Sequence, residues 1–196
     1  MRKQLSVISA LTILIAASFV LVRHLKGSHQ ATQSPYVNQL SSSVRGLSAQ
    51  EIDDLLNGRG MGYARTAELN GYPGPLHILE LEEKLELSTE QAQKIEAVFQ
   101  EMNTEAKKIG KEIIEHEEEL STLFADGEIT ATELRMRTES LAALDGELRA
   151  THLEAHLKAT PVLSSEQITA YNTLRGYTER GYADGGSHNH EHHHTN

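Results

Sequence analysis

Two histidines near the end of one expected helix have the residue type and spacing to bind a metal ion. His152 and His156 are four residues apart, so on a helix both imidazoles lie on one face, about one turn apart. Neutral imidazole is a good ligand for Zn, Ni, Co and Cu(II), and such a pair can chelate one ion. The alternative is that both are polar residues on the surface of an acidic helix. Two ligands are too few, so a metal site needs others from elsewhere in the fold.

Carboxylates on the preceding helix are a first source of further ligands. Counting back through the hairpin turn at Asp126-Gly127 places Glu101 and Glu105 on the outgoing helix at roughly the same height as His152 and His156. Either carboxylate is a candidate ligand. A shell of histidine and glutamate without sulfur suits borderline divalent ions rather than Cu(I). Because histidine binds metal in its deprotonated form, affinity should fall below about pH 6.

Other potential ligands have competing explanations. His116 falls in the apolar register of its helix, so it is either a core-edge side chain or part of a second site with Glu117 or Glu119. Met61 and Met102 are assigned to hydrophobic packing rather than to ligation. The C-terminal tail is either an expression tag or a native chelating tract, which would bind metals weakly and raise their local concentration. Its histidines are His188, His190, His192, His193 and His194.

Two long antiparallel helices must position the candidate ligands. Ser88 can cap the first helix, Asp126-Gly127 forms a turn, and the second helix runs from near Thr130 to Pro161. Each helix has an apolar stripe, and the first repeats at about 3.5 residues. The first stripe comprises Ile95, Phe99, Met102, Ala106, Ile109, Ile113, Leu120 and Leu123. The second comprises Leu134, Leu141, Leu144, Leu148 and Leu157.

Shorter helices are expected on either side of this hairpin. Ser48 and Glu51 form a capping-box pattern at the start of one, and Gly58 and Gly60 end it. We predict an all-α fold, an elongated antiparallel hairpin with short flanking helices and four to five helices in all. A hairpin alone leaves one face uncovered, so a homodimer is expected. Further flanking helices are expected over residues 61–69, 76–85 and 163–176.

Composition excludes several classes of protein. The chain has 196 residues and a formal net charge of -10, which argues against a nucleic-acid partner because phosphates require a basic face. Cysteine is absent, so disulfides, thiolate metal sites and a lipoprotein anchor are excluded. Aromatic residues make up 5% of the chain, fewer than a β-sandwich or barrel normally shows.

The N-terminal segment Leu5–Val22 is apolar and flanked by basic residues. At about 1.5 Å per residue it is just long enough to cross a hydrocarbon core of about 30 Å. No small-residue cleavage site follows, which favours an uncleaved signal anchor over a cleaved signal peptide. We expect a single-pass inner-membrane protein with its bulk in the periplasm. The expected domains are a signal anchor at 1–26, a flexible tether at 27–46, a helical periplasmic domain at 47–180 and a disordered His-rich tail at 181–196.

Two near-identical phrases begin helices, Leu87-Ser-Thr-Glu-Gln91 and Leu163-Ser-Ser-Glu-Gln167. They resemble the paired L-[TS]-x-x-Q motifs of the Spy/CpxP-like periplasmic proteins, and the resemblance extends over roughly Leu47 to Tyr177. That group includes refolding chaperones, zinc-resistance accessory proteins and CnrX-like heavy-metal sensors. The resemblance implies an elongated helical dimer and periplasmic metal sensing or buffering.

Among these relatives, the CnrX-like sensors are most similar at the histidines. Their site combines an early Leu-His, a second His one turn on, a carboxylate from the next helix and a His-x-x-x-[Met/His] pair on the return helix. Here Leu76-His77 and the pair His152 and His156 fall at the matching places. The resemblance therefore adds His77 to the ligands. The sequence departs from the pattern at Leu81, where the second early histidine would stand.

We therefore expect a membrane-anchored periplasmic protein that binds divalent Zn, Ni, Co or Cu ions in heavy-metal sensing or resistance. The alternative is a Spy/CpxP-like refolding chaperone or envelope-stress regulator. Candidate partners are a sensor kinase, an anti-sigma factor or unfolded envelope proteins. The sequence has no serine–histidine–aspartate pattern, phosphate-binding loop or zinc-protease motif, so no enzymatic activity is expected.

Overall fold

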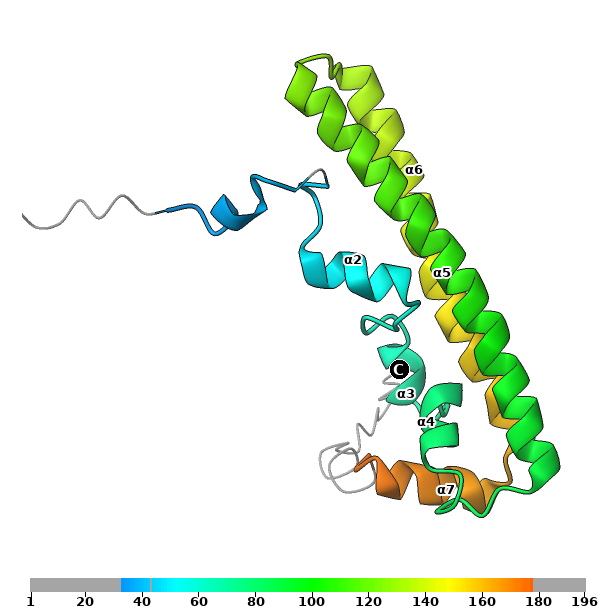
Figure 1. Cartoon of the computed structure of the whole chain (residues 1–196). Coiled ribbons are helices and arrows are strands. Elements are labelled where there is room, and N and C mark those ends of the chain that lie inside the picture. Colours follow the sequence, from blue (N-terminus) through cyan, green and yellow to red (C-terminus); the bar gives the residue numbers. More distant parts are fainter. Residues whose placement is uncertain (1–32, 43, 178–196) are drawn as a thin grey trace, which may run out of the picture. The chain divides into compact units, whose positions relative to one another are not determined.

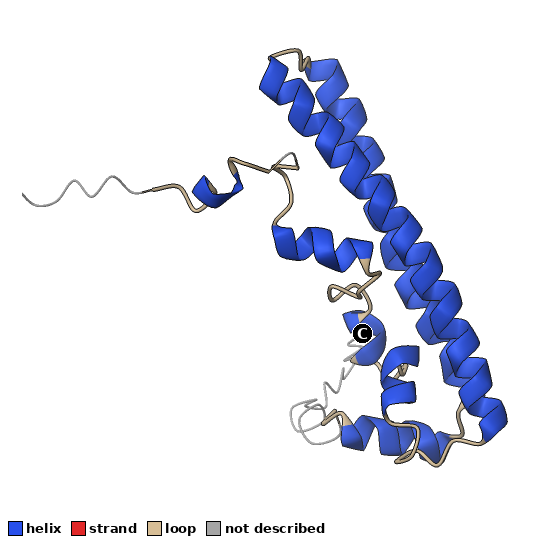
Figure 2. Ribbon diagram, viewed as in Figure 1, coloured by secondary structure: helices blue, strands red, loops and turns tan. Residues whose placement is uncertain are grey.

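Helices supply the regular structure of residues 33–42 and 44–177, the part of the chain that the computed structural model describes (Figure 2). The chain divides after Ser41 into two units. The described part of the first contains a 3-10 turn, η1 (Val37–Gln39). The second contains α2 to α7 and the 3-10 turn η2 (Thr160–Val162). The all-α prediction is confirmed, but the described residues hold six α-helices rather than four to five, because even the single turn α3 (Arg65–Glu68) forms.

The predicted antiparallel hairpin is formed by α5 (Thr89–Asp126) and α6 (Ala131–Ala159) (Figure 1). At about 1.5 Å per residue, the 38 residues of α5 extend about 57 Å. Gly127 ends α5 in the left-handed conformation, with φ of 70°, and Thr130 caps α6 by accepting a hydrogen bond from the Glu133 N–H. The turn therefore lies where the Asp-Gly pair predicts it.

Two apolar clusters pack against the hairpin. One joins α2 (Ala49–Leu56) to its middle, and the other joins α4 (Pro75–Glu80) and α7 (Ser165–Leu174) to the end away from the Gly127 turn (Figure 1). On α6, Leu148 belongs to the first cluster and Ala159 to the second. The turns of α6 that carry the two candidate histidines therefore lie between the clusters. The buried members of the first are Leu55, Ala106, Ile109, Ile113 and Leu148, and those of the second are Ile78, Leu85, Ile95, Ala159, Leu163 and Tyr171.

A glycine lets α2 pack closely on α5. A Cβ added to Gly110 would lie 2.9 Å from the carbonyl carbon of Leu55, closer than real Cβ contacts. Gly110 is buried within α5, and Leu55 is the buried residue at the end of α2. The absence of a side chain at position 110 thus sets the distance between α2 and the hairpin.

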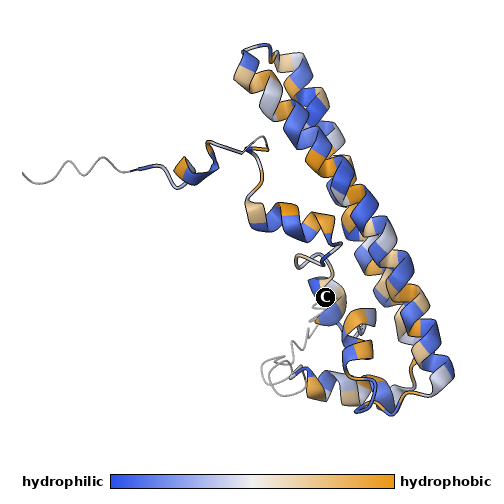
Figure 3. Ribbon diagram, viewed as in Figure 1, coloured by the Kyte–Doolittle hydropathy of each residue, from blue (hydrophilic) through white to orange (hydrophobic). Residues whose placement is uncertain are grey.

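The buried face of α6 differs from the leucine stripe expected from the sequence. Leu157 is 58% exposed, whereas the buried residues of the helix are Leu148, His152, Ala155, His156 and Ala159. The leucine stripe was wrong at Leu134 and Leu157, which are both exposed, and alanine and histidine rather than leucine occupy the last core positions of α6. Hydrophobic and hydrophilic residues are interleaved along both long helices (Figure 3), so leucine spacing alone does not fix the face.

The expected helix over 76–85 is shorter in the structure. α4 ends at Glu80, and a turn follows in which Glu86 takes a left-handed conformation with φ of 50°. Leu85 and Leu87 from this turn reach the apolar cluster around Ile78 and Tyr171. The chain therefore reverses direction here before α5 begins.

The two Leu-Ser-x-x-Gln motifs contact each other. In each, the serine side chain accepts a hydrogen bond from the N–H of the glutamine three residues later, and the glutamine side chain accepts one from the serine N–H. Gln91 Nε2 also donates to the Val162 carbonyl at 2.9 Å, and Gln167 Nε2 donates to the Leu85 carbonyl at 3.1 Å. The two amides bond each other reciprocally, at 2.8 and 3.2 Å.

Among the described residues, no helix has both the length and the apolar character needed to cross a bilayer. The predicted anchor Leu5–Val22 lies outside the described residues, as does the His-rich tail 181–196.

We expect Gln91→Glu to destabilise the protein by about 2–3 kcal/mol, because a carboxylate cannot donate to the Val162 carbonyl and would face the Gln167 oxygen. Urea unfolding followed by far-UV circular dichroism measures the change. Gln93→Glu, at an exposed position two residues further along α5, is the matched control and should stay within about 0.5 kcal/mol of the parent. Equal stability of the two variants would contradict the role given to the amide pair.

Candidate metal centre

His152 and His156 occupy core positions of α6. They are 3% and 6% exposed and are the buried polar or charged residues that the described structure contains. Apolar neighbours on the same face, Leu148, Ala155 and Ala159, are also buried. These histidines are therefore not surface residues of an acidic helix, which was the alternative interpretation of the pattern.

The imidazole of His152 is held against an aromatic ring. Tyr63 stacks on it with ring centroids 6.0 Å apart and an interplanar angle of 12°. The buried Nε2 of His152 has no hydrogen-bond partner among the described residues. Burial, and then the neighbouring His156, lower the pKa of His152 to about 4. The ring is thus neutral at neutral pH, the form in which histidine binds a metal.

The imidazole of His156 is oriented by the backbone. Its Nδ1 donates to the carbonyl oxygen of Tyr72 at 2.8 Å, so Nε2 carries the lone pair. That Nε2 lies 3.0 Å from the point where a Cβ on Gly74 would stand. The hydrogen bond to a carbonyl fixes both the tautomer and the direction of the free nitrogen.

A carboxylate that sequence analysis did not identify lies beside His156. Glu68 Oε1 is 2.8 Å from the same Gly74 Cβ point, and the hydroxyl of Tyr171 donates to both Glu68 oxygens, at 2.8 and 3.0 Å. Glu68 ends the one-turn helix α3, which contacts α6. No spacing rule connects residue 68 with residue 156, so only the packing of α3 on α6 could have identified it.

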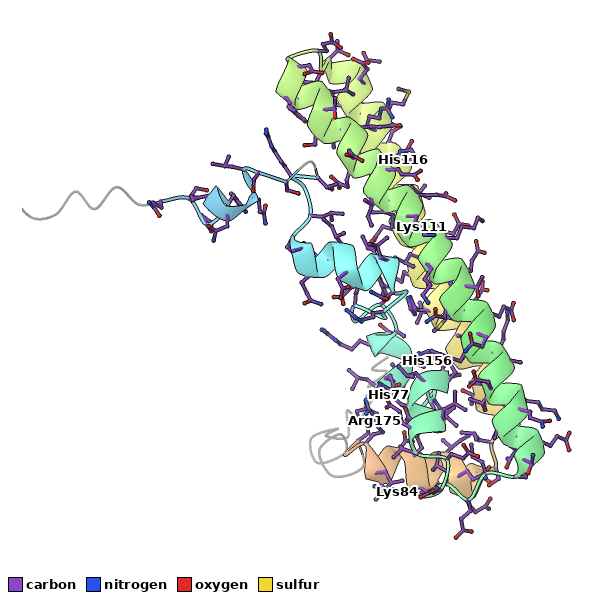
Figure 4. The ribbon with its side chains drawn as sticks, in the orientation of Figure 1. His77, Lys84, Lys111, His116, His156 and Arg175 are labelled. Carbon is purple, nitrogen blue, oxygen red and sulfur yellow. The ribbon has the colours of Figure 1, made fainter. Side chains whose placement is uncertain are left out.

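His77 lines the same cavity as His152 and His156. The cavity measures about 620 Å³ and is also bordered by Glu68, Met61 and Met102. His77 projects from α4, and its Nδ1 donates to Glu80 Oε2 at 2.7 Å, so Nε2 is the ring nitrogen left to accept from a ligand. Figure 4 shows His77 and His156 at the level of α3 and α4. The structure therefore brings all three predicted histidines to one cavity.

Glu101 and Glu105 lie at the predicted level but on another side of the hairpin. They border a separate groove together with residues of α6 that include Thr151, Glu154 and Lys158. Lys158 donates to Glu101 at 2.9 Å, and Lys108 donates to Glu105 at 2.9 Å. Counting residues through the turn placed Glu101 and Glu105 at the correct height along the hairpin. The side of the hairpin on which they lie depends on how each helix is rotated about its axis, which counting does not give.

The described residues contain no group of three His, Asp or Glu side chains that could hold a metal ion as they stand. An ion in the cavity would therefore require side chains to rotate toward one another. His116 is half-buried on α5 with an Nδ1 that has no partner in the described structure, and it does not border this cavity. The tail histidines His188, His190, His192, His193 and His194 lie outside the described residues.

The chain is an all-α protein in which a long hairpin and short flanking helices border an open cavity lined by three histidines. Residues 59–170 match the family described as heavy-metal resistance. Because the match spans more than half of the 196 residues, the chain belongs to this family. The matched region includes His77, His152 and His156 as well as Glu68. No curated protein and no solved structure matches the chain.

We expect the metal-free protein to lose stability as the pH falls from 6.5 toward 4. The pKa of His152 is about 4 when folded and near 6.5 when unfolded, so the unfolded state binds the proton first. The contribution of the neutral ring is complete above pH 6.5, decreases as the pH falls below that value and is fully lost by about pH 4.

The measurement is urea unfolding with a chelator present, at pH 7.5 and pH 4.5. His152→Leu removes the titrating group, so it should lose less stability than the parent over this window, by roughly 2–3 kcal/mol. Equal losses in the two proteins would show that His152 does not titrate as a buried group.

Proposed function

We propose that this protein binds a divalent transition-metal ion, Zn, Ni, Co or Cu(II), through His77, His152 and His156 and acts in heavy-metal sensing or resistance. The observation that carries the proposal is the buried Nε2 of His152, which has no hydrogen-bond partner among the described residues and belongs to a ring that borders the shared cavity. A buried polar atom without a partner costs about 1–3 kcal/mol. A metal ion bound to that nitrogen would offset the cost.

The tautomers of the other two histidines support the same proposal. His156 donates from Nδ1 to the Tyr72 carbonyl, and His77 donates from Nδ1 to the Glu80 carboxylate. Histidines that bind metals almost always donate their second nitrogen to a carbonyl or carboxylate, which fixes the ring and makes the free nitrogen more basic. The donor set contains no thiolate, which suits borderline divalent ions rather than Cu(I).

Side-chain movement gives the proposed site a means of signalling. His77 is the most exposed of the three, with 35% of its side chain accessible, and it comes from α4, whereas the other two come from α6. An ion that draws the His77 ring toward α6 would tie α4 to the hairpin. Metal binding would then change the packing of short helices against the hairpin, as a metal sensor requires.

The remaining features of the proposal concern the setting of the protein. We propose that Leu5–Val22 anchors it in the inner membrane, that the helical domain lies in the periplasm and that it forms a homodimer. The His-rich tail would raise the local concentration of ions near the structured site. The protein would act by binding and not by catalysis, with a sensor kinase or an anti-sigma factor as the candidate partner.

Metal binding should depend on the structured histidines. In full-length protein in detergent micelles, with the five tail histidines replaced by Asn, we expect His152→Ala and His156→Ala each to weaken Zn and Ni binding about tenfold or more, and His77→Ala about tenfold. Titration calorimetry measures the dissociation constants. His116→Ala, a histidine outside the cavity, is the matched control and should leave them unchanged.

Two outcomes would contradict the proposal. Either the tail-substituted protein binds none of the four ions, or it binds them and the three alanine variants bind equally well. The Spy/CpxP-like chaperone alternative would then be tested by whether the protein suppresses aggregation of an unfolded client.

A further inference from the structure

Gly74 lets a carboxylate and an imidazole approach its backbone closely. A Cβ at this position would lie 2.8 Å from Glu68 Oε1 and 3.0 Å from His156 Nε2, so both atoms border the volume that a side chain would fill. The backbone of Gly74 has φ of -83° and ψ of 139°, a conformation that any residue adopts. Glycine is therefore not needed here for its backbone freedom, and what it contributes is the absence of a Cβ, which would lie too close to both side chains.

Tyr171 holds the Glu68 carboxylate at the edge of this space. Its ring is fully buried on α7, and its hydroxyl donates to both Glu68 oxygens. The Gly74 N–H points to the same hydroxyl, at 3.4 Å. The carboxylate is thus fixed by a group that is itself immobilised in the apolar cluster, and His156 Nε2 lies near the same Gly74 Cβ point.

We propose that Glu68 is the carboxylate ligand of the metal site, and that Tyr171 is a residue that positions it. This inference rests on the proposed function and assigns to Glu68 the role that sequence analysis gave to Glu101 or Glu105. Those two side chains border a different groove and are paired with lysines. Glu68 instead borders the cavity that His77, His152 and His156 share.

The resulting set of donor atoms suits a divalent transition-metal ion. Three neutral imidazoles and one carboxylate give four ligands, the number that Zn and Co(II) commonly take, with nitrogen and oxygen donors only. The carboxylate supplies one negative charge, which offsets half of the charge of a divalent ion inside a largely apolar cavity. A hydrogen bond from Tyr171 to a ligating carboxylate is the kind of outer contact that orients metal ligands.

The test uses full-length protein in detergent micelles with the five tail histidines replaced by Asn, and Co(II) and Zn as the probes. Glu68→Gln keeps the size of the side chain and an oxygen that can accept from Tyr171, but removes the charge. We expect Co(II) and Zn affinity to fall about tenfold or more and the visible absorption bands of bound Co(II) to shift, because an anionic ligand is lost. Glu83→Gln, an exposed carboxylate on the turn after α4, is the matched control.

Two further variants separate ligation from a structural role. Gly74→Ala places a methyl group against both Glu68 and His156 while keeping every donor, and should also lower affinity about tenfold. Tyr171→Phe should lower affinity less and leave the Co(II) bands in place, because it disturbs only the position of the carboxylate. Far-UV circular dichroism establishes that each variant is folded. If Glu68→Gln does not fold, the metal affinity of Gly74→Ala tests the role of Glu68 instead.

The inference fails if Glu68→Gln and Gly74→Ala bind Co(II) with the affinity and spectrum of the parent while His152→Ala and His156→Ala lose binding. It also fails if Glu101→Gln or Glu105→Gln produces the loss expected of Glu68→Gln. In both cases the histidine site itself stands. If the parent with the substituted tail binds no Co(II) or Zn at all, the proposed function fails as well, so the two failures are distinguishable.

Discussion

Two reciprocal hydrogen bonds between the Gln91 and Gln167 amides hold together the end of the helical domain that lies away from the Gly127 turn. Each amide oxygen accepts from its own helix N-terminus and from the other amide, and each nitrogen donates to the other amide and to a loop carbonyl. All hydrogen-bonding capacity of both side chains is therefore used. This contact joins the start of α5 to the start of α7 and thereby places Tyr171, which in turn holds Glu68.

The cavity occupies a break between the two apolar clusters of the hairpin. The apolar clusters of the hairpin lie around Leu148 and around Ala159, and two of the three buried positions of α6 between these residues are histidines. An apolar side chain at position 152 would pack there without an unpartnered nitrogen. Retaining imidazole in such a place reduces stability unless something binds to it, which is the arrangement expected of a ligand site rather than of a structural core.

Short elements rather than the long hairpin complete the surroundings of the histidines. Tyr63 covers His152, Tyr72 orients His156, and Glu68 and His77 come from α3 and α4. The hairpin supplies a rigid face with two imidazoles, and the connection between α2 and α5 folds over it with the remaining polar groups. Because α3 and α4 contain few residues and border an open cavity, their packing is the part of the fold that a bound ion would affect most.

The sequence by itself determined the local structure. The capping motifs set the starts of α2, α5 and α7, and the Asp-Gly pair set the turn. The paired motifs, together with His77, His152 and His156, indicated the family and the residues around one cavity. These follow from contacts within a few residues or from a recurring pattern. Only the tertiary structure decided which side of α6 the histidines occupy, that Glu101 and Glu105 lie in another groove, and that Glu68 lies beside His156. Those facts depend on helix rotation and on the packing of α3, which involve residues far apart in the chain and leave no periodic signal in it.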